Sequence, residues 1–397
     1  MSKGKKLIFL FLIAGLYLVV RVSFLPLELN DRAIILGVGV DYDENQKIFT
    51  LSAEIVTPKQ DAMGSESSAT QGSQKIVKGN GESVGLAIRD LFNSFGKTPS
   101  FGECGIIMLG ETCAKKVLLQ NSLDYFIESN AFRDGTIVVV CEGDAQEMLK
   151  KRSQVDEYVS FALQTLLVQS GSRAQIQYTT LNSTAQGFFD KSESCFLNLI
   201  KFERQDSAQS ESSAGGSQSD NKYQGKFKTG QMALFSDGKY VGELNRQEVN
   251  GLNLFDDKNI FCSFVDRTNP QKSALGLDTK RVKREIEFRE GKVVVRLDVF
   301  LGIKPLLTDT VGEVFSLKLK ETSQLNDLQK KSVREDAKNA ILLAFDKCAQ
   351  TDCDFLGVKN ALYAKYGKDY DSIIKQTGEG KSFWNNVILE TKIKCEG

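Results

Sequence analysis

Apolar and polar residues alternate along the first third of the chain in short runs typical of strands. Apolar runs at 33–40 and 48–56 flank a polar turn at 41–45, which predicts two neighbouring strands. Later apolar runs at 104–109 and 136–141 predict two more strands.

A helix between these strands is indicated by one continuous apolar stripe. The stripe has the spacing i, i+3, i+4, i+7, i+8 and i+11 and consists of Val84, Ala87, Ile88, Leu91, Phe92 and Phe95. Ser83 is a suitable N-cap, and Gly96 is a suitable stop. Strands followed by alternating helices and strands favour a mixed sheet with helices packed on it.

The second half of the chain has the pattern of hairpins followed by helices. Asp237-Gly238 and Glu290-Gly291 each separate two apolar-rich runs, and Asp-Gly is a strong hairpin signal. The predicted elements are strands at 230–235, 239–244, 284–289 and 292–300, helices at 323–351 and 357–366, and a strand at 387–395.

The N-terminus has the build of a membrane leader. Three lysines precede the apolar run 7–20, and the segment extended to Leu27 is 21 residues long, close to the roughly 20 that span a bilayer. No A-x-A-like cleavage site is present, because Ala14 is the only alanine before Ala33. We expect an uncleaved signal anchor, with a cleaved signal peptide as the alternative, and the remaining chain on the far side of one membrane.

The clearest compositional boundary lies at 205–221, where no apolar side chain is larger than alanine, which predicts a flexible linker. The expected fold class is α+β and multidomain, with mixed β-sheets and packed helices after one N-terminal membrane anchor helix. The expected divisions are a signal anchor at 1–28, an N-terminal α/β domain at 29–204, the linker at 205–221, a small β-rich middle domain at 222–275 and a C-terminal α+β domain at 276–397.

Composition excludes several classes of function. Lys+Arg and Asp+Glu balance at 51 each, so no nucleic-acid partner is expected, because phosphate binding needs a basic excess. The chain has no histidine, which rules out Ser-His-Asp hydrolysis, Cys-His proteolysis and histidine-based zinc sites. Its eight cysteines form no CxxC; we expect buried free thiols, with disulfides as the open alternative, including one between Cys348 and Cys353.

Isolated motifs in the sequence are weak. Gly37-Val38-Gly39 lacks the third glycine of a dinucleotide site, so we expect these glycines to ease tight packing of a strand. The run Asp41-x-Asp43-x-Asn45 begins like a calcium loop but has Gln46 where the loop needs glycine. It is therefore predicted to be a polar turn.

Two further features have a structural and a functional interpretation. Asp352 and Asp354 flank a cysteine at a helix junction; they could act as an acid–base pair, but capping the following helix is favoured. Trp384 is expected in the core rather than on a ligand platform. No catalytic, cofactor-binding or metal-binding residue is predicted.

Several segments, taken in order, resemble the C subunits of spore germinant receptors, the Ger(x)C family. The resembling segments are 29–41 (LNDRAIILGVGVD), the helix after Gly81, Phe101-Gly102, 123–126 (LDYF) before 132–134 (FRD), 230–235 (GQMALF), 239–245, 353–358 (CDFLGV) and 387–397. Three departures stand out: there is no lipobox cysteine, Glu103 replaces a frequent histidine, and Leu356-Gly357-Val358 replaces Gly-Phe-Gly.

The resemblance implies a non-catalytic, three-domain extracytoplasmic protein in the spore inner membrane. It implies two partners, a multi-pass A subunit and a transporter-like B subunit, in a complex that responds to nutrients. Membrane attachment would come from the N-terminal segment rather than from a lipid, and whether the protein itself binds a small molecule stays open. The alternatives are an extracytoplasmic solute-binding protein or transporter adaptor, and a wall-processing enzyme that depends on paired carboxylates.

Overall fold

The computed structural model describes residues 4, 12–15, 17, 32–56, 75–93, 96–153, 156, 158–172, 176–204, 224–255, 263–265, 274–305 and 326–396. Most of the predicted anchor at 7–27 lies outside these residues. Within them, no helix combines the length and the apolar character needed to cross a membrane.

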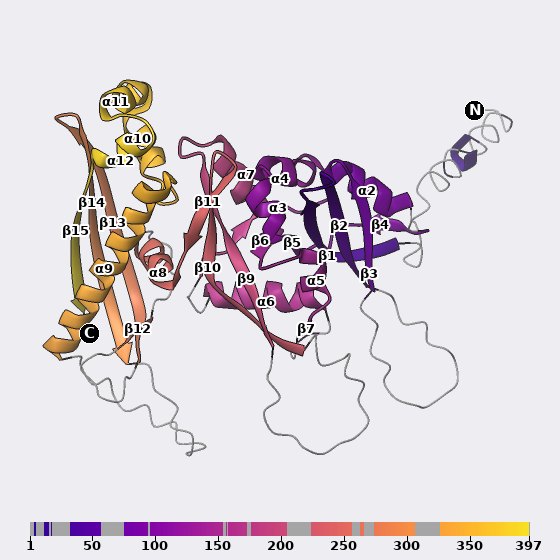
Figure 1. The fold of residues 1–397 in the computed structure, drawn as a ribbon, viewed down its shortest axis with the longest axis horizontal. Coiled ribbons are helices and arrows are strands. Elements are labelled where there is room, and N and C mark those ends of the chain that lie inside the picture. The colour runs from indigo at the N-terminus through magenta and orange to yellow at the C-terminus, as the bar shows by residue number, and fades with distance from the viewer. Residues whose placement is uncertain are drawn as a thin grey trace, which may run out of the picture.

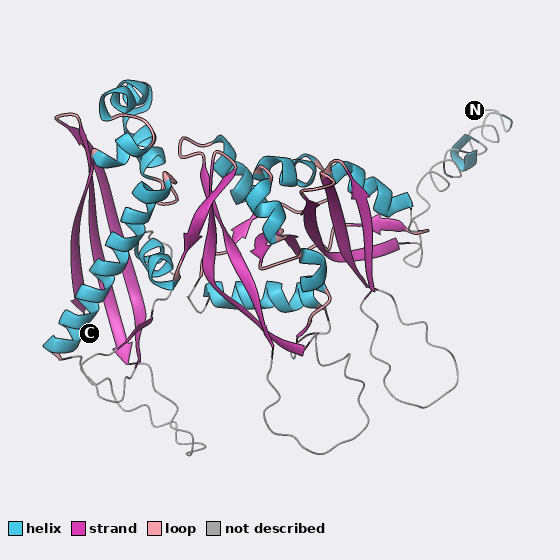
Figure 2. Ribbon diagram, viewed as in Figure 1, coloured by secondary structure: helices cyan, strands magenta, loops and turns pink. Residues whose placement is uncertain are grey.

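The N-terminal half is built on a mixed sheet of eleven strands (Figures 1 and 2). The strands are β1 (Arg32–Asp43), β2 (Ile48–Val56), β3 (Lys75–Gly81), β4 (Thr98–Ser100), β5 (Ile106–Leu109), β6 (Ile137–Cys141), β7 (Arg152–Ser153), β8 (Thr179–Thr180), β9 (Ser194–Arg204), β10 (Gln224–Ser236) and β11 (Lys239–Leu244). The main order is β11-β10-β9-β6-β5-β1-β2-β3. The central strands β1, β5, β6 and β9 run parallel, and both flanks are antiparallel.

Helices cover both faces of this sheet. They are α2 (Val84–Asn93), α3 (Glu111–Lys116), α4 (Leu119–Glu128), α5 (Ala145–Leu149), α6 (Val159–Ser172) and α7 (Leu181–Phe189). Ile107 and Leu109 of β5 pack with α2, α3, α4 and α7, whereas Ile106 and Met108 face α5 and α6. Because successive side chains of a strand point to opposite faces, a strand buried on both sides is a continuous apolar run.

The C-terminal half contains a four-stranded sheet in the order β12-β13-β14-β15. Its strands are β12 (Ser263–Val265), β13 (Ala274–Arg289), β14 (Lys292–Pro305) and β15 (Val387–Glu396); its helices are α8 (Arg246–Phe255), α9 (Asp327–Thr351), α10 (Val358–Tyr366), α11 (Tyr370–Thr377) and α12 (Lys381–Asn385). In β14 the residues Val293, Val295, Leu297 and Val299 are fully buried beneath the helices. The opposite face of this sheet carries ion pairs, among them Arg296 with Glu390 at 2.8 Å.

A shared hydrophobic core joins the two halves. Met232 and Leu234 of β10 belong to the same cluster as Val249 of α8 and Ile341 of α9, which pack in turn on the four-stranded sheet. In Figure 1, α8 lies between the two sheets, and α9 crosses in front of the four-stranded sheet. Asn326 and Gln329 form a capping box, which fixes the residue at which α9 begins.

The α+β prediction with mixed sheets and packed helices is confirmed. The helix predicted from Val84 is α2, and both predicted hairpins form, as β10–β11 and β13–β14. The predicted linker at 205–221 lies outside the described residues, but β9 and β10 on either side of it pair antiparallel. The segment therefore connects two neighbouring strands of one sheet. The division of the chain into domains stays a prediction.

Candidate functional site

The half-buried Asp41 and the buried Glu54 of the N-terminal half hold the first turns of two helices. Asp41 of β1 accepts hydrogen bonds from the amides of Ala145 at 2.7 Å and Gln146 at 2.9 Å, at the start of α5. Glu54 of β2 accepts from the amides of Val159 and Ser160, both at 2.9 Å, at the start of α6. Each carboxylate satisfies donors that a helix leaves unpaired at its N-terminus. These side chains therefore position the helices on one face of the sheet.

Asp354 performs the same role in the C-terminal half. Its carboxylate accepts from the amides of Val358 at 2.8 Å and Lys359 at 2.7 Å, at the start of α10. Asp352 instead ends α9 in the left-handed conformation, with φ 51°. The prediction that this pair caps the following helix is confirmed for Asp354. With its oxygens committed to α10, Asp354 is not arranged as half of an acid–base pair.

Burial shifts the ionisation of two of these carboxylates. Desolvation raises the pKa of Asp41 to about 6, against the opposing effect of its two backbone hydrogen bonds. Desolvation likewise raises the pKa of Asp354 to about 7, with Lys359 and Arg284 acting in the opposite direction. The helix amides that both groups accept from lower these pKa values, so the upward shifts come from desolvation at the capping positions.

The junction between α9 and α10 is hydrogen-bonded to the larger sheet. The amide of Asp354 donates to the hydroxyl of Ser194 at 2.9 Å, and the Cys353 thiol donates to the carbonyl of Phe235 at 3.3 Å. The hydroxyl of Ser236 donates to the carbonyl of Asp352 at 3.0 Å. These three hydrogen bonds add directional contacts between the two halves to the shared hydrophobic core.

The weak motifs have structural roles. Asp43 accepts from the amides of Asn45 at 2.8 Å and Gln46 at 3.1 Å, so the predicted polar turn is confirmed. A Cβ at Gly37 would collide with Ser160 at the start of α6, which confirms the tight-packing interpretation of that glycine. No group of three or more potential metal ligands occurs in the described part of the chain.

The cysteines and the tryptophan belong to the core. The seven described cysteines, which include Cys348 and Cys353, are free thiols; Cys395 is half-buried and the other six are buried. Cys262 lies outside the described residues. Trp384 is 3% exposed and meets the rings of Phe345 and Phe383 edge-on, so its predicted place in the core is confirmed.

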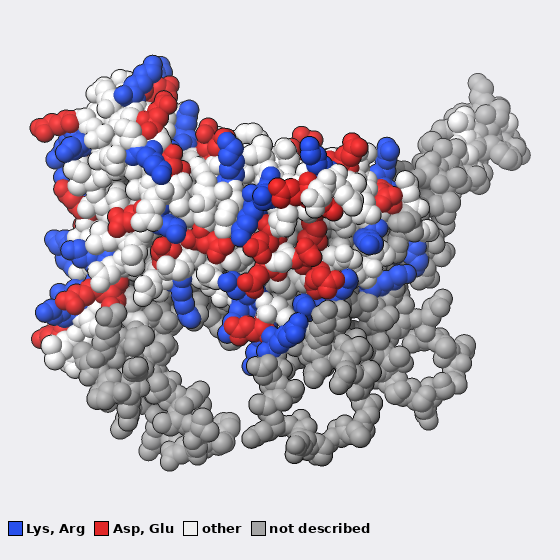
Figure 3. Space-filling model, in the orientation of Figure 1, with Lys and Arg blue, Asp and Glu red and all other residues white. Residues whose placement is uncertain are grey.

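Charged side chains of both signs are interspersed across the face in Figure 3, with acidic side chains gathered over its middle. Near the carboxyl ends of β5 and β6, the acidic groups have partners within the protein. Glu111 pairs with Lys115 at 2.6 Å, and Glu142 lies 3.8 Å from Lys201. Such an internally balanced cluster resembles an ordinary solvated surface rather than a site.

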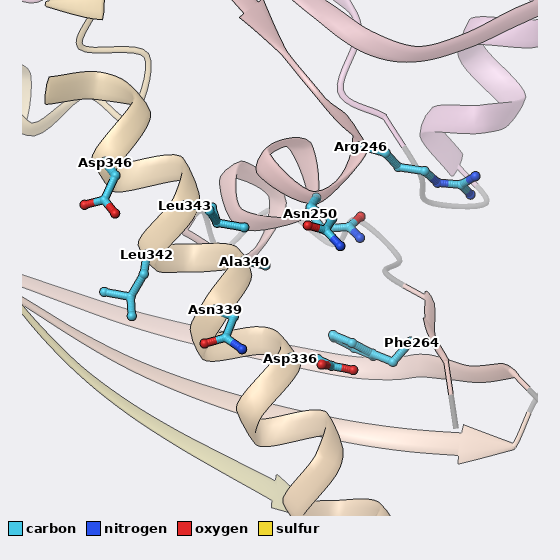
Figure 4. A pocket seen from close by; sticks show the side chains of 10 residues that line it. Arg246, Asn250, Phe264, Asp336, Asn339, Ala340, Leu342, Leu343 and Asp346 are labelled. Carbon is cyan, nitrogen blue, oxygen red and sulfur yellow. The ribbon is translucent and has the colours of Figure 1, made fainter. Parts of the chain in front are cut away.

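Two larger hollows are open to solvent. The C-terminal groove, of about 800 Å³, lies between α8, α9 and β12 (Figure 4). Asn250 of α8, Asn339 and Leu343 of α9, and Phe264 of β12 line it together with charged side chains. Its lining mixes amide, carboxylate and apolar groups.

The N-terminal groove, of about 720 Å³, lies between the β1–β2 hairpin, the start of α2 and one face of α4. The aromatic and charged residues in its lining are Tyr42, Phe49, Tyr125, Glu82, Asp124, Glu128, Lys47 and Lys116, and apolar and uncharged polar residues complete it. Neither groove was predicted from the sequence. The only available signal was the spacing of Asp124 and Glu128, which places like charges four residues apart on one helix.

Taken together, the described residues form a two-sheet α+β protein in which the carboxylates of Asp41, Glu54 and Asp354 are helix caps and the larger hollows are open grooves. Two family models match its sequence. The spore germination protein N-terminal domain matches residues 26–202, and the spore germination B3/GerAC-like C-terminal domain matches residues 230–396. The chain belongs to the C-subunit family of spore germinant receptors, as the sequence resemblance implied.

A crystal structure of the GerBC protein is similar in fold. It has 13% sequence identity and a TM-score of 0.48, and the match covers 91% of this chain and 97% of that chain. No curated protein sequence matches the chain.

Proposed function

We propose that this protein is a non-catalytic, membrane-tethered subunit of a nutrient germinant receptor. In this proposal it contributes to spore germination signalling together with a polytopic A subunit and a transporter-like B subunit. The observation that carries the proposal is the pair of family matches, which together extend from residue 26 to residue 396. A role without catalysis agrees with a chain that has no histidine and uses the carboxylates of Asp41, Glu54 and Asp354 as helix caps.

The proposed location is the extracytoplasmic face of the spore inner membrane, with the segment 7–27 as the tether. The three lysines before the apolar run support this assignment, because a basic end followed by an apolar segment is the build of a signal anchor. The mass of the mature chain tests it. A chain that starts near residue 25 would have lost the tether, and the protein would then need another means of attachment.

Gene deletion in a strain without redundant receptors tests the function. We expect the deletion to abolish or alter nutrient germination, and we expect the protein to co-purify with a polytopic partner from spore membranes. Unchanged germination with every amino acid and sugar tested would contradict the proposal.

A solute-binding protein or transporter adaptor is the second candidate function, and the C-terminal groove of about 800 Å³ is the observation that favours it. A solute that fills this groove should raise thermal stability by RT ln(1+[L]/Kd). A thermal-shift screen without any response would count against this alternative.

A further inference from the structure

The N-terminal groove has acidic side chains that the protein itself leaves unmatched. Glu82, Asp124 and Glu128 line it, and none of them has a hydrogen-bond or ion-pair partner among the described residues. Of the two lysines in the lining, Lys116 is already paired with Glu44 at 3.1 Å. Lys47 is left to face three carboxylates, so the groove carries an excess of negative charge.

Most neighbouring carboxylates are engaged, which makes this excess distinctive. In the same half of the molecule the salt-bridged acids are Glu44, Glu103, Glu111, Glu142, Glu147, Glu203 and Asp237. Asp41 and Glu54 hold helix termini. Asp134, Asp144 and Glu193 in this half also have no side-chain partner among the described residues, but the groove brings three such acids together.

Two of the groove acids are placed unfavourably for their own helix. Asp124 and Glu128 lie four residues apart on α4, where like charges repel. Glu128 is the last residue of α4, and a helix C-terminus disfavours a negative charge; the last turn has no basic residue to offset it. Burial and the nearby Glu128 both raise the pKa of Asp124. Residues that destabilise their own helix without a compensating contact in the protein are expected at functional sites.

Aromatic and apolar side chains complete the groove. Tyr42 and Phe49 pack at 5.0 Å between ring centroids, and Tyr125 lines the opposite side on α4. Leu118 also lines the groove and is 41% exposed. Rings beside carboxylates suit a lysine or arginine side chain, because the ring faces attract the cation while the stem packs on apolar surface.

The openness of the groove indicates the size of its occupant. Small-molecule sites enclose most of the ligand, whereas here Asp124 and Glu128 are exposed and the hollow is open to solvent. We propose that the N-terminal groove docks a basic, partly apolar peptide segment of a partner subunit of the receptor. This inference rests on the proposed function, since that function supplies the partner.

Site-specific crosslinking in intact spores tests the position of the interface. A photo-crosslinking amino acid at Leu118 should form an adduct with the polytopic or the transporter-like subunit, and the crosslinked peptide should contain lysine or arginine. The control position is Leu328 on α9, which is 67% exposed and lies outside the groove. Equal adduct formation at both positions would overturn the proposal. Adducts at Leu118 that contain no second protein would also overturn it and would indicate a small molecule or a lipid as the occupant.

Charge reversal tests the chemistry. The double variant Asp124→Lys/Glu128→Lys should lower the adduct yield about ten-fold, because opposed charges at an interface are replaced by like charges. The matched control is Glu335→Lys on α9, an exposed carboxylate outside both grooves, which should leave the yield unchanged. Asp124→Asn/Glu128→Gln removes the charge without reversing it and should have an intermediate effect. A Lys→Glu or Arg→Glu change in the crosslinked segment should restore the yield with the double lysine variant.

The two proposals fail in different ways. If the gene deletion leaves germination unchanged, the proposed function fails whatever the groove does. If the deletion abolishes germination but the double lysine variant accumulates normally and keeps its wild-type adduct yield, only the groove proposal is overturned.

Discussion

The two sheets differ in how many of their faces are buried. Residues on both faces of β5 are buried, because helices cover the larger sheet on both sides. In the four-stranded sheet one face lies under helices, and the other carries ion pairs such as Arg296–Glu390. The first arrangement requires continuous apolar strands, whereas the second permits alternation. The sheet with an open face is therefore stabilised by packing on one side, whereas the central strands of the larger sheet are stabilised by packing on both sides.

The largest effects are expected from truncating core side chains, and they test this difference directly. Ile107→Ala and Met108→Ala, on opposite faces of β5, should each lower the free energy of unfolding by about 3 kcal/mol. In β14, Leu297→Ala should cost a similar amount, whereas Asp298→Ala next to it should cost less than about 1 kcal/mol. Urea denaturation measures all four. Equal costs for the two β14 variants would contradict the one-sided burial of this sheet.

The next largest effect is a pH dependence that separates the two halves. A carboxylate whose pKa rises on folding binds more protons in the folded state than in the unfolded state. Its stabilising contribution is therefore full below its ordinary pKa of 3.8 and is lost as the pH rises through the folded value. This loss should end near pH 6 for Asp41 in the larger sheet and near pH 7 for Asp354 in the C-terminal half.

Asparagine variants reveal these contributions. In the wild-type protein the urea midpoint should fall as the pH rises. Asp41→Asn and Asp354→Asn should each reduce this fall in the pH range between the ordinary and the folded pKa of the replaced carboxylate. Both should also be destabilised, because an amide oxygen cannot accept both helix amides as a carboxylate does. Asp346→Asn, an exposed change on α9, is the control. If the variant curves run parallel to the wild-type curve, these carboxylates do not titrate as described.

A smaller effect is expected from the ion pairs on the open face of the C-terminal sheet. Arg296 bonds to Glu390 at 2.8 Å and also lies 3.3 Å from Glu287, but its side chain is 36% exposed and that of Glu390 is 54% exposed. Glu390→Gln should therefore shift the urea midpoint only slightly, and salt at about 1 M should remove the difference. A large shift in the urea midpoint that persists in salt would mean that these ion pairs are shielded from solvent. It would contradict the open face of the four-stranded sheet.

The smallest effect should come from reducing agents. The seven described cysteines are free thiols in both halves, and burial raises the pKa of Cys104 and Cys113 to about 12 and that of Cys395 to about 11. Reductant should therefore leave the thermal midpoint unchanged. Brief alkylation of the native protein should label Cys395 before Cys104 or Cys113, as peptide mass spectrometry would show. A mass change of two on reduction of the unmodified chain would contradict this picture.

Local patterns predicted individual elements well where one strong signal determined each of them. The stripe from Val84 is α2, and Asp237-Gly238 is the turn of a hairpin. The helices α7 and α8 were not predicted. In α8, charged and amide residues at Arg246, Gln247 and Asn250 conceal the apolar stripe, which becomes recognisable only where α8 packs on α9. Tertiary packing overrides a weak local pattern of this kind.

By itself, the sequence determined the apolar periodicity, the turns, the absence of histidine-based chemistry and the resemblance to the germinant receptor family. Only the tertiary structure decided that β9 and β10 pair across the segment 205–221, because strand pairing depends on contacts between distant residues. Tertiary structure also brought Asp41 to the start of α5, 104 residues away, and assembled the N-terminal groove from a hairpin and two helices. Periodicity records which side of an element is buried. Which distant element buries it is decided by the packing of the whole chain.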